Sequence, residues 1–284
     1  MSETPSDIAA GAAGAEAVIR LEHVSKAFGD NVVFADLALD FERGRTTVVL
    51  GQSGVGKSVL LKLILGLIRP DAGRIWLDGA EITRMPEHKL IEIRTHFGMV
   101  FQGAALFDYL TVYENVAFPL REHRKMPEDQ MRRVVADKLR LVDMEGTEAL
   151  LPEELSGGMR KRVGLARAIA MDPEVILYDE PTTGLDPVTG DTINQLILRC
   201  QRELKATGLV VTHDISSAYK VGDRLVMLQD GAILADGTPA DIRRHPDERV
   251  QQFIGGVAEP DHGWSARGRT APLAPGLPDQ RTES

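Results

Sequence analysis

The stretch Gly51-Gln52-Ser53-Gly54-Val55-Gly56-Lys57-Ser58 decides the fold of this chain. It matches every fixed position of the pattern G-x-x-x-x-G-K-[S/T], which cradles phosphate groups. The apolar, β-branched run 46–50 leads into it, and residues 58–67 have helical character after it. A strand, a glycine-rich loop and a helix in this order are the context that a phosphate-binding loop (P-loop) requires. The sequence therefore predicts an α/β protein with a P-loop nucleotide-binding core.

Each residue type in the loop suits phosphate binding. The glycines at 51, 54 and 56 let the backbone curl until its N–H groups face phosphate oxygens. The Lys57 ammonium reaches the β- and γ-phosphates, and the Ser58 hydroxyl is placed for Mg²⁺. The alternative is a glycine-rich loop without a ligand. The predicted nucleotide contacts are Gly51, Gln52, Ser53, Gly54, Val55, Gly56, Lys57 and Ser58.

Two carboxylates end a second apolar strand, Val175-Ile176-Leu177-Tyr178-Asp179-Glu180. At the carboxyl end of a buried parallel strand, Asp179 can hold Mg²⁺ through water. Glu180 points elsewhere and is a candidate general base for the attacking water. The alternative is a pair of turn acids, since Pro181 follows. With a P-loop upstream, the catalytic interpretation is favoured.

Three further features are weak when each is taken alone. The stretch Leu155-Ser156-Gly157-Gly158-Met159 opens a helix, where N–H groups and the Ser156 hydroxyl form an anion site, or where a cap merely precedes flexible glycines. His213 follows the apolar strand 209–212, and a lone histidine is more often structural than functional. Gln102 ends the short strand 97–102.

The order of these motifs resembles that of the ATP-binding cassette (ABC) ATPase family over residues 18–246. The resemblance implies an ATP hydrolase with a RecA-like P-loop core that uses ATP and Mg²⁺. It makes Gln102 the Q-loop residue, which joins Ser58 and Asp179 at the metal. It makes His213 the switch histidine, Asp186 in 184–186 the D-loop aspartate, and Phe28 the aromatic residue that stacks on adenine. Catalytic roles thereby pass to Glu180, His213 and Gln102.

The same resemblance implies a head-to-tail homodimer. Each ATP then lies between the P-loop of one subunit and the Ser156, Gly157 and Gly158 turn of the other. Hydrolysis opens this arrangement, and the helical insert passes the motion to a partner.

Two sequence features indicate a subgroup within the family. Met159 stands where the usual signature has glutamine, and the block 97–120 is distinctive. Together they resemble the ATPases of Mla/Mce-type lipid transporters of bacteria with a double-layered envelope. That resemblance implies an MlaE-type membrane permease, an Mce-domain protein, often a STAS-domain protein, and a peripheral position on the cytoplasmic face of the inner membrane. The alternatives are an ABC importer or exporter for another solute, and a non-transport ABC protein of translation or DNA repair, which typically has two cassettes or a long coiled coil.

The bulk composition agrees with a globular enzyme. The 284 residues carry a formal net charge of −9, which argues against bulk binding of nucleic acid. The single cysteine excludes a disulfide within the chain and favours a reducing compartment. The longest apolar run, 59–68, contains Lys62 and is far shorter than the ~20 residues that span a bilayer. Membrane association is therefore expected through a partner.

The pattern along the chain predicts the domain organisation. Residues 1–17 are expected to be a disordered leader, and 18–254 an ABC ATPase domain that opens with β-rich segments at 18–24, 32–34 and 37–41. A helical subdomain is expected at about 103–170, with helices at 112–122, 128–141 and 157–170. Residues 255–284 are expected to be a flexible tail, either solvated or a partner-binding arm. The basic run 160–162 is expected to be a solvated helix face, the alternative being a role near the nucleotide or anionic lipid headgroups.

Overall fold

The computed structural model describes residues 16–256 of the chain. The expected leader and the expected tail therefore lie almost wholly outside the described residues. Ala17, the last residue of the expected leader, is the first of strand β1 (Ala17–Phe28), and Gly255, the first of the expected tail, is the last of helix α9 (Glu248–Gly255). None of the helices between 16 and 256 is both long and apolar enough to cross a membrane.

A six-stranded sheet forms the centre of the molecule, in the order β10-β9-β3-β8-β7-β6. β10 runs antiparallel to β9, and all the other neighbouring pairs are parallel. The parallel pairing brings the carboxyl ends of β3, β7 and β8 to one edge. The six strands are β3 (Thr46–Leu50), β6 (Phe97–Val100), β7 (Val175–Asp179), β8 (Thr207–Thr212), β9 (Arg224–Gln229) and β10 (Ala232–Gly237).

Both faces of this sheet are covered, which explains why its strands are almost continuously apolar. Val49 joins the core on the side of helix α1 (Lys57–Ile64), together with buried leucines of that helix. Val48 joins the core on the side of helices α6 (Pro187–Leu204) and α7 (Ile215–Val221). α6 begins at Pro187, because the Asp186 side chain caps it.

An antiparallel sheet, in the order β2-β1-β4-β5, packs over α1 and provides the β-rich subdomain. Its strands are β1 (Ala17–Phe28), β2 (Asn31–Glu42), β4 (Ala72–Leu77) and β5 (Ala80–Glu81). The two short strands expected at 32–34 and 37–41 are one strand, because β2 stays paired with β1 through most of its length. Helix α2 (Glu87–Arg94), which the sequence pattern did not indicate, follows this sheet.

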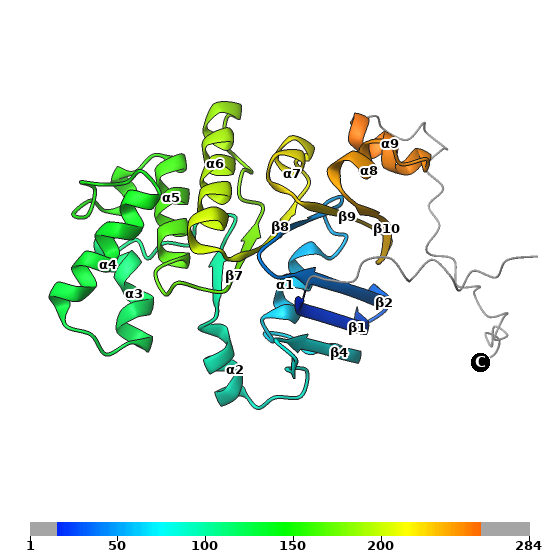
Figure 1. Ribbon diagram of the computed structural model, residues 1–284, viewed down its shortest axis with the longest axis horizontal. Helices are drawn as coiled ribbons and strands as arrows, with labels where there is room; N and C mark the ends of the chain where they lie inside the picture. Colours follow the sequence, from blue (N-terminus) through cyan, green and yellow to red (C-terminus); the bar gives the residue numbers. More distant parts are fainter. Residues whose placement is uncertain (1–15, 257–284) are drawn as a thin grey trace, which may run out of the picture.

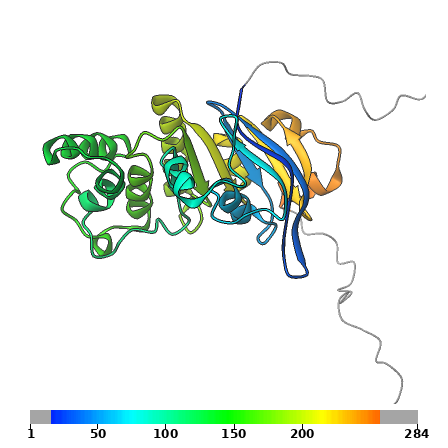
Figure 2. The same ribbon diagram turned by 90° about the horizontal axis from the view of Figure 1, so that it is seen from below.

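Helices replace strands between β6 and β7. α3 (Val112–His123), α4 (Glu128–Leu141), the short 3₁₀ turn Pro152–Glu154 and α5 (Gly157–Ala168) form a compact group. Thr111 and Glu114 form a capping box at the start of α3, which sets that boundary. Figures 1 and 2 show this helical group at one end of the molecule and the antiparallel sheet toward the other. Helices α8 (Pro239–Arg243) and α9 follow β10, and α9 spans Glu248–Gly255.

Candidate nucleotide-hydrolysis site

The P-loop joins β3 to α1 at the carboxyl edge of the central sheet. Gly54 and Gly56 have φ angles of 87° and 106°, in the region that favours glycine. A Cβ atom on Gly56 would also lie 2.5 Å from Cγ1 of Val33 and 2.9 Å from the Phe34 ring. The loop can therefore curl close to β2 only because glycine stands there.

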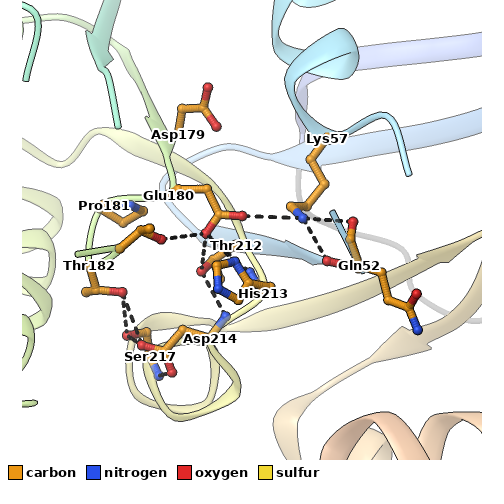
Figure 3. Close-up of polar contacts among 12 residues, drawn as sticks. Gln52, Lys57, Asp179, Glu180, Pro181, Thr182, Thr212, His213, Asp214 and Ser217 are labelled. Carbon is orange, nitrogen blue, oxygen red and sulfur yellow. Dashed lines mark hydrogen bonds and ion pairs between the residues drawn. The ribbon is translucent and has the colours of Figure 1, made fainter. Parts of the chain in front are cut away.

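Lys57 is buried at the start of α1 and lies at the centre of the site (Figure 3). Its Nζ donates hydrogen bonds to the main-chain oxygens of Gly51 (2.7 Å) and Gln52 (3.1 Å). It also lies 3.3 Å from Oε1 of Glu180. The ammonium thus stabilises the loop through hydrogen bonds and places a positive charge beside Glu180, which follows β7.

Ser58 and Asp179 face each other across the gap between α1 and β7. The Ser58 hydroxyl is 3.4 Å from both carboxylate oxygens of Asp179. Burial raises the pKa of Asp179 above its usual 3.8, against the hydrogen bond from Ser58. Burial disfavours the charged form of the Asp179 carboxyl group, and a bound cation would compensate for this. The carboxylate and the Ser58 hydroxyl together provide hard oxygen ligands, which suit Mg²⁺. Within residues 16–256 no cluster of three or more carboxylate, histidine or cysteine ligands could hold a metal alone.

Glu180 is the most heavily coordinated carboxylate of the site. Its Oε2 accepts hydrogen bonds from Thr183 Oγ1 and Thr212 Oγ1, both at 3.1 Å, and lies 2.9 Å from His213 Nδ1. Burial pushes the pKa of Glu180 upward, but the hydrogen bond from His213 and the charge of Lys57 outweigh it. The pKa therefore lies below the usual 4.5, so the group is ionised at neutral pH.

A second layer of polar groups, which the sequence analysis missed, supports Glu180 from below (Figure 3). The Thr182 hydroxyl donates to Oδ2 of Asp214 (3.1 Å), and the Ser217 hydroxyl donates to the same oxygen (2.6 Å). Thr212 Oγ1 accepts from the Asp214 main-chain N–H at 3.0 Å. The sequence did contain a local signal for this layer. Asp214 directly follows His213 and is the N-cap of α7, and Ser217 is the third residue of that helix.

The turn Ser156-Gly157-Gly158 starts α5 in the helical group, away from the P-loop of the same chain (Figure 1). Ser156 caps this helix by accepting from the Met159 N–H at 3.3 Å, and Ser156 and Gly157 are exposed. Asp186 is also exposed and caps α6 by accepting from Val188 and Thr189, both at 3.0 Å. These residues are presented outward rather than gathered around Lys57.

Gln102 and Phe28 also lie at the surface. Gln102 follows β6 and makes no side-chain hydrogen bond to another described residue. In the loop just after it, Ala104 and Ala105 have left-handed φ angles of 61° and 50°. Phe28 ends β1 with half of its surface exposed, and Lys26 Nζ lies 5.2 Å from its ring centre. An exposed ring at this position is free to stack on a flat ligand.

The expectation for the basic run 160–162 is wrong at its central residue. Arg160 is exposed, but Lys161 is only 8% exposed and faces the segment after β7. Its Nζ donates to the main-chain oxygens of Pro181 (2.7 Å) and Thr183 (2.8 Å), and is 3.4 Å from that of Glu180. Helical spacing alone did not distinguish it from its exposed neighbour Arg160.

A family model described as "ABC transporter" matches residues 34–183, more than half of the chain. The chain belongs to the ABC transporter family. The match begins in β2 and ends just after Glu180, so it includes the P-loop, the helical group and both carboxylates. The chain is therefore an ABC-type ATP hydrolase.

Relatives of this ABC ATPase cover most of its length. The intermembrane phospholipid transport system ATP-binding protein MlaF of Haemophilus influenzae is 41% identical over 242 residues, 85% of this chain and 92% of that protein. The probable ribonucleotide transport ATP-binding protein mkl of Mycobacterium leprae is 45% identical over 84% of this chain and 69% of that protein. A dimeric, post-hydrolysis structure of the ATP-binding cassette MJ0796, bound to ADP and Pi, has a TM-score of 0.72 and 33% identity, covering 78% of this chain and 98% of that one.

Proposed function

We propose that this ABC ATPase drives a bacterial transporter that moves phospholipids between membranes. The carrying observation is its 41% identity to an intermembrane phospholipid transport ATPase, of which it covers 92%. The block 97–120, which resembles lipid-transport ATPases in sequence, also contributes much of an apolar groove described below. In this proposal the chain is peripheral, on the cytoplasmic face of the inner membrane.

The proposed roles follow from the contacts at the P-loop. The N–H groups of the loop and Lys57 hold the phosphates of ATP, and Phe28 stacks on its adenine. Ser58, Asp179 and Gln102 would hold Mg²⁺, which would neutralise phosphate charge when bound. Glu180 is ionised and already paired with His213, so it can accept a proton from the attacking water.

A second copy of the chain completes the site. The turn Ser156-Gly157-Gly158 forms the N-terminus of α5, where Ser156 and Gly157 are exposed, and a helix N-terminus binds anions. Placed head to tail, each turn meets the phosphates held by the partner, with Asp186 nearby. ABC ATPases form dimers, and the dimeric cassette structure has the same fold as this chain.

The permease would dock in an apolar groove of about 510 Å³ between the central sheet and the helical group. Phe107 and Phe118 line it with ring centres 4.7 Å apart, and Phe118 is 37% exposed. Phe101, the neighbour of Gln102, also lines it and is 44% exposed. A partner helix seated there would bury aromatic surface and touch the loop that carries Gln102. We propose an MlaE-type permease as this partner, with Mce-domain and STAS-domain proteins as further subunits.

Ribonucleotide transport is the second candidate. It is favoured by the 45% identity to the mycobacterial protein, which is higher than that to the phospholipid transport relative. The chain covers a smaller share of that protein, 69% against 92%. The two candidates share the ATPase site and differ in what the attached membrane protein carries.

Purification of the full-length chain from bacterial membranes separates the candidates. We expect a membrane protein to co-purify, with phospholipid in its solvent extract, and ATP hydrolysis to rise with added phosphatidylethanolamine vesicles but not with uridine monophosphate. Stimulation by the nucleotide without bound phospholipid would favour the second candidate. Absence of any membrane partner would contradict both.

Phe118→Glu is the matched variant for this experiment. A charge in the groove should abolish co-purification of the membrane protein, because it would be desolvated against the apolar partner. Binding of ATP to the isolated chain should stay unchanged, since Phe118 is not among the residues around Lys57. Retention of the partner by Phe118→Glu would remove the groove as the docking site.

A further inference from the structure

Lys161 is a buried lysine whose ammonium meets main-chain oxygens instead of a carboxylate. The three donors of its Nζ are directed at the carbonyls of Glu180, Pro181 and Thr183. Within residues 16–256 it is the only group recorded as donating to the oxygens of Pro181 and Thr183. Removing its donors would therefore leave the buried Pro181 carbonyl and the partly buried Thr183 carbonyl unpaired, which the fold strongly avoids.

The segment that Lys161 holds sets the backbone of Glu180. Glu180 has a left-handed φ of 48°, which a residue with a side chain adopts only when its surroundings enforce it. On the strand side, the Glu180 N–H donates to the Val211 oxygen at 2.9 Å. On the other side, Lys161 holds the carbonyl groups of 180, 181 and 183. The two sets of contacts together fix the direction of the Glu180 side chain.

The start of α6, which follows this segment, packs tightly against the start of α5. A Cβ atom on Gly158 would lie 2.6 Å from Cγ2 of Thr189, so α5 and α6 approach as closely as a glycine permits. Lys161 is one helical turn after Gly158, on the side of α5 that faces this segment. The close contact thus joins the Ser156–Gly158 turn to the start of α6, and the Lys161 ammonium joins the same helix α5 to the backbone behind Glu180.

We infer that Lys161 is a positioning residue that keeps the Ser156–Gly158 turn in register with Glu180. The inference rests on the proposed head-to-tail ATPase, in which the two features of one chain serve two different ATP molecules. Lys161 then links the two composite sites within each subunit. Burial lowers the pKa of the Lys161 ammonium, and the negative charge of Glu180 opposes this effect.

Lys161→Met removes the donors and keeps the length of the side chain. Lys138→Met is the matched control, because Lys138 is also a largely buried lysine of the helical group, but its partner is Asp172. In the full-length chain within its membrane complex, we expect Lys161→Met to lower kcat for ATP hydrolysis at least tenfold relative to Lys138→Met. The dissociation constant for ATP, measured on the isolated chain without Mg²⁺, should change by less than twofold.

A second measurement, of ATP-dependent dimerisation, tests the position of the Ser156–Gly158 turn without relying on ATP hydrolysis. In a Glu180→Gln background, which allows ATP to hold the dimer, Lys161→Met should weaken ATP-dependent dimerisation at least tenfold, and Lys138→Met should not. Lys161→Arg or Lys161→Gln, which keep donors, should regain at least threefold of the lost kcat. The thermal unfolding midpoint of each variant is measured in parallel, and Lys161→Leu, which also lacks donors, replaces Lys161→Met if the latter does not fold.

Three outcomes would overturn the inference: a kcat for Lys161→Met within twofold of the control, an unchanged dimerisation constant, or no recovery by either donor-bearing variant. Failure of the proposed function is recognised separately. In that case the wild-type complex does not hydrolyse ATP, or Glu180→Gln alone forms no ATP-dependent dimer.

Discussion

At the scale of single residues, Glu180 depends on its backbone as much as on its side chain. Its left-handed φ of 48° costs roughly 1–2 kcal/mol for a non-glycine residue. In return, one carboxylate oxygen faces Lys57 and the other faces His213 and Thr212. The strain is located at the residue proposed to act as the base, where such outliers are often found.

Glu180→Gln tests that role directly. The amide keeps the shape of the side chain but cannot take a proton from water, so hydrolysis should fall by about 10²–10⁴-fold. ATP binding should persist, because the P-loop and Lys57 are unchanged. Single-turnover hydrolysis and equilibrium ATP binding on the same preparation measure the two effects. Normal turnover in this variant would remove Glu180 as the base.

Asp179→Asn tests the energetic consequence of burying a carboxylate. Burial raises the folded-state pKa of Asp179 above its unfolded value of 3.8. Stability therefore falls as the pH rises from 3.8 through the folded pKa, and stays lower above it. Without nucleotide at pH 7, the variant should raise the thermal unfolding midpoint by on the order of 2 °C. The gain should shrink as the pH approaches 3.8.

The same variant should lose Mg²⁺-dependent hydrolysis, because the carboxylate proposed to hold the ion is gone. Asp186→Ala provides the contrast in stability. It removes the cap of α6, and should lower the midpoint through a loss of about 1 kcal/mol. A lower midpoint for Asp179→Asn than for the unmodified chain would refute the assigned cost of burial.

At the scale of elements, the start of α5 can lie close to the start of α6 because residue 158 is a glycine and has no side chain. Gly158→Ala would place its Cβ 2.6 Å from Cγ2 of Thr189, so the two helices must separate or shift. We expect a loss of about 1–3 kcal/mol in stability, as for other overpacked sites. Thermal or denaturant unfolding of the isolated chain measures it.

Two companion variants make this prediction sharp. Thr189→Ser removes the methyl group that would clash, so it should restore most of the stability lost in Gly158→Ala. Gly157→Ala is the control, because its nearest neighbour would be Cδ2 of Leu185 at 3.9 Å, an ordinary contact. Equal destabilisation by both alanines would show that the contact with Thr189 does not limit the approach of the helices.

At the scale of the whole molecule, the head-to-tail arrangement predicts complementation between chains. A dimer of one Ser156→Arg chain and one Lys57→Ala chain carries both lesions in the same composite site and leaves the other intact. It should hydrolyse ATP faster than either homodimer. Rates are measured on heterodimers purified through two different affinity tags.

The control places the two lesions in one chain, Lys57→Ala/Ser156→Arg, paired with an unmodified chain. Each composite site then carries one lesion, so activity should fall to the level of the weaker homodimer. If this pairing were as active as the complementing one, the P-loop and the Ser156 turn would serve the same ATP within one chain, contrary to the model.

Much of this architecture could be predicted from local patterns. The apolar runs at 46–50 and 175–178, the helices of 103–170 and the α/β class are present in the structure, because buried parallel strands and amphipathic helices have distinct periods. The helix α2 and the continuity of β2 were missed. In both places the sequence is polar or mixed, and packing against distant segments decides the conformation.

The sequence by itself determined the family and the order of the chemical groups. A P-loop, two carboxylates after an apolar strand and a histidine after another are local facts, since each depends on neighbouring residues alone. Only the tertiary structure decided which groups meet. Parallel pairing of β7 with β8 puts Glu180 beside His213, and the packing of α5 on the start of α6 puts Lys161 beside the main-chain oxygen of Glu180. Sequence periodicity cannot encode such contacts, because they join segments whose separation along the chain leaves no local trace.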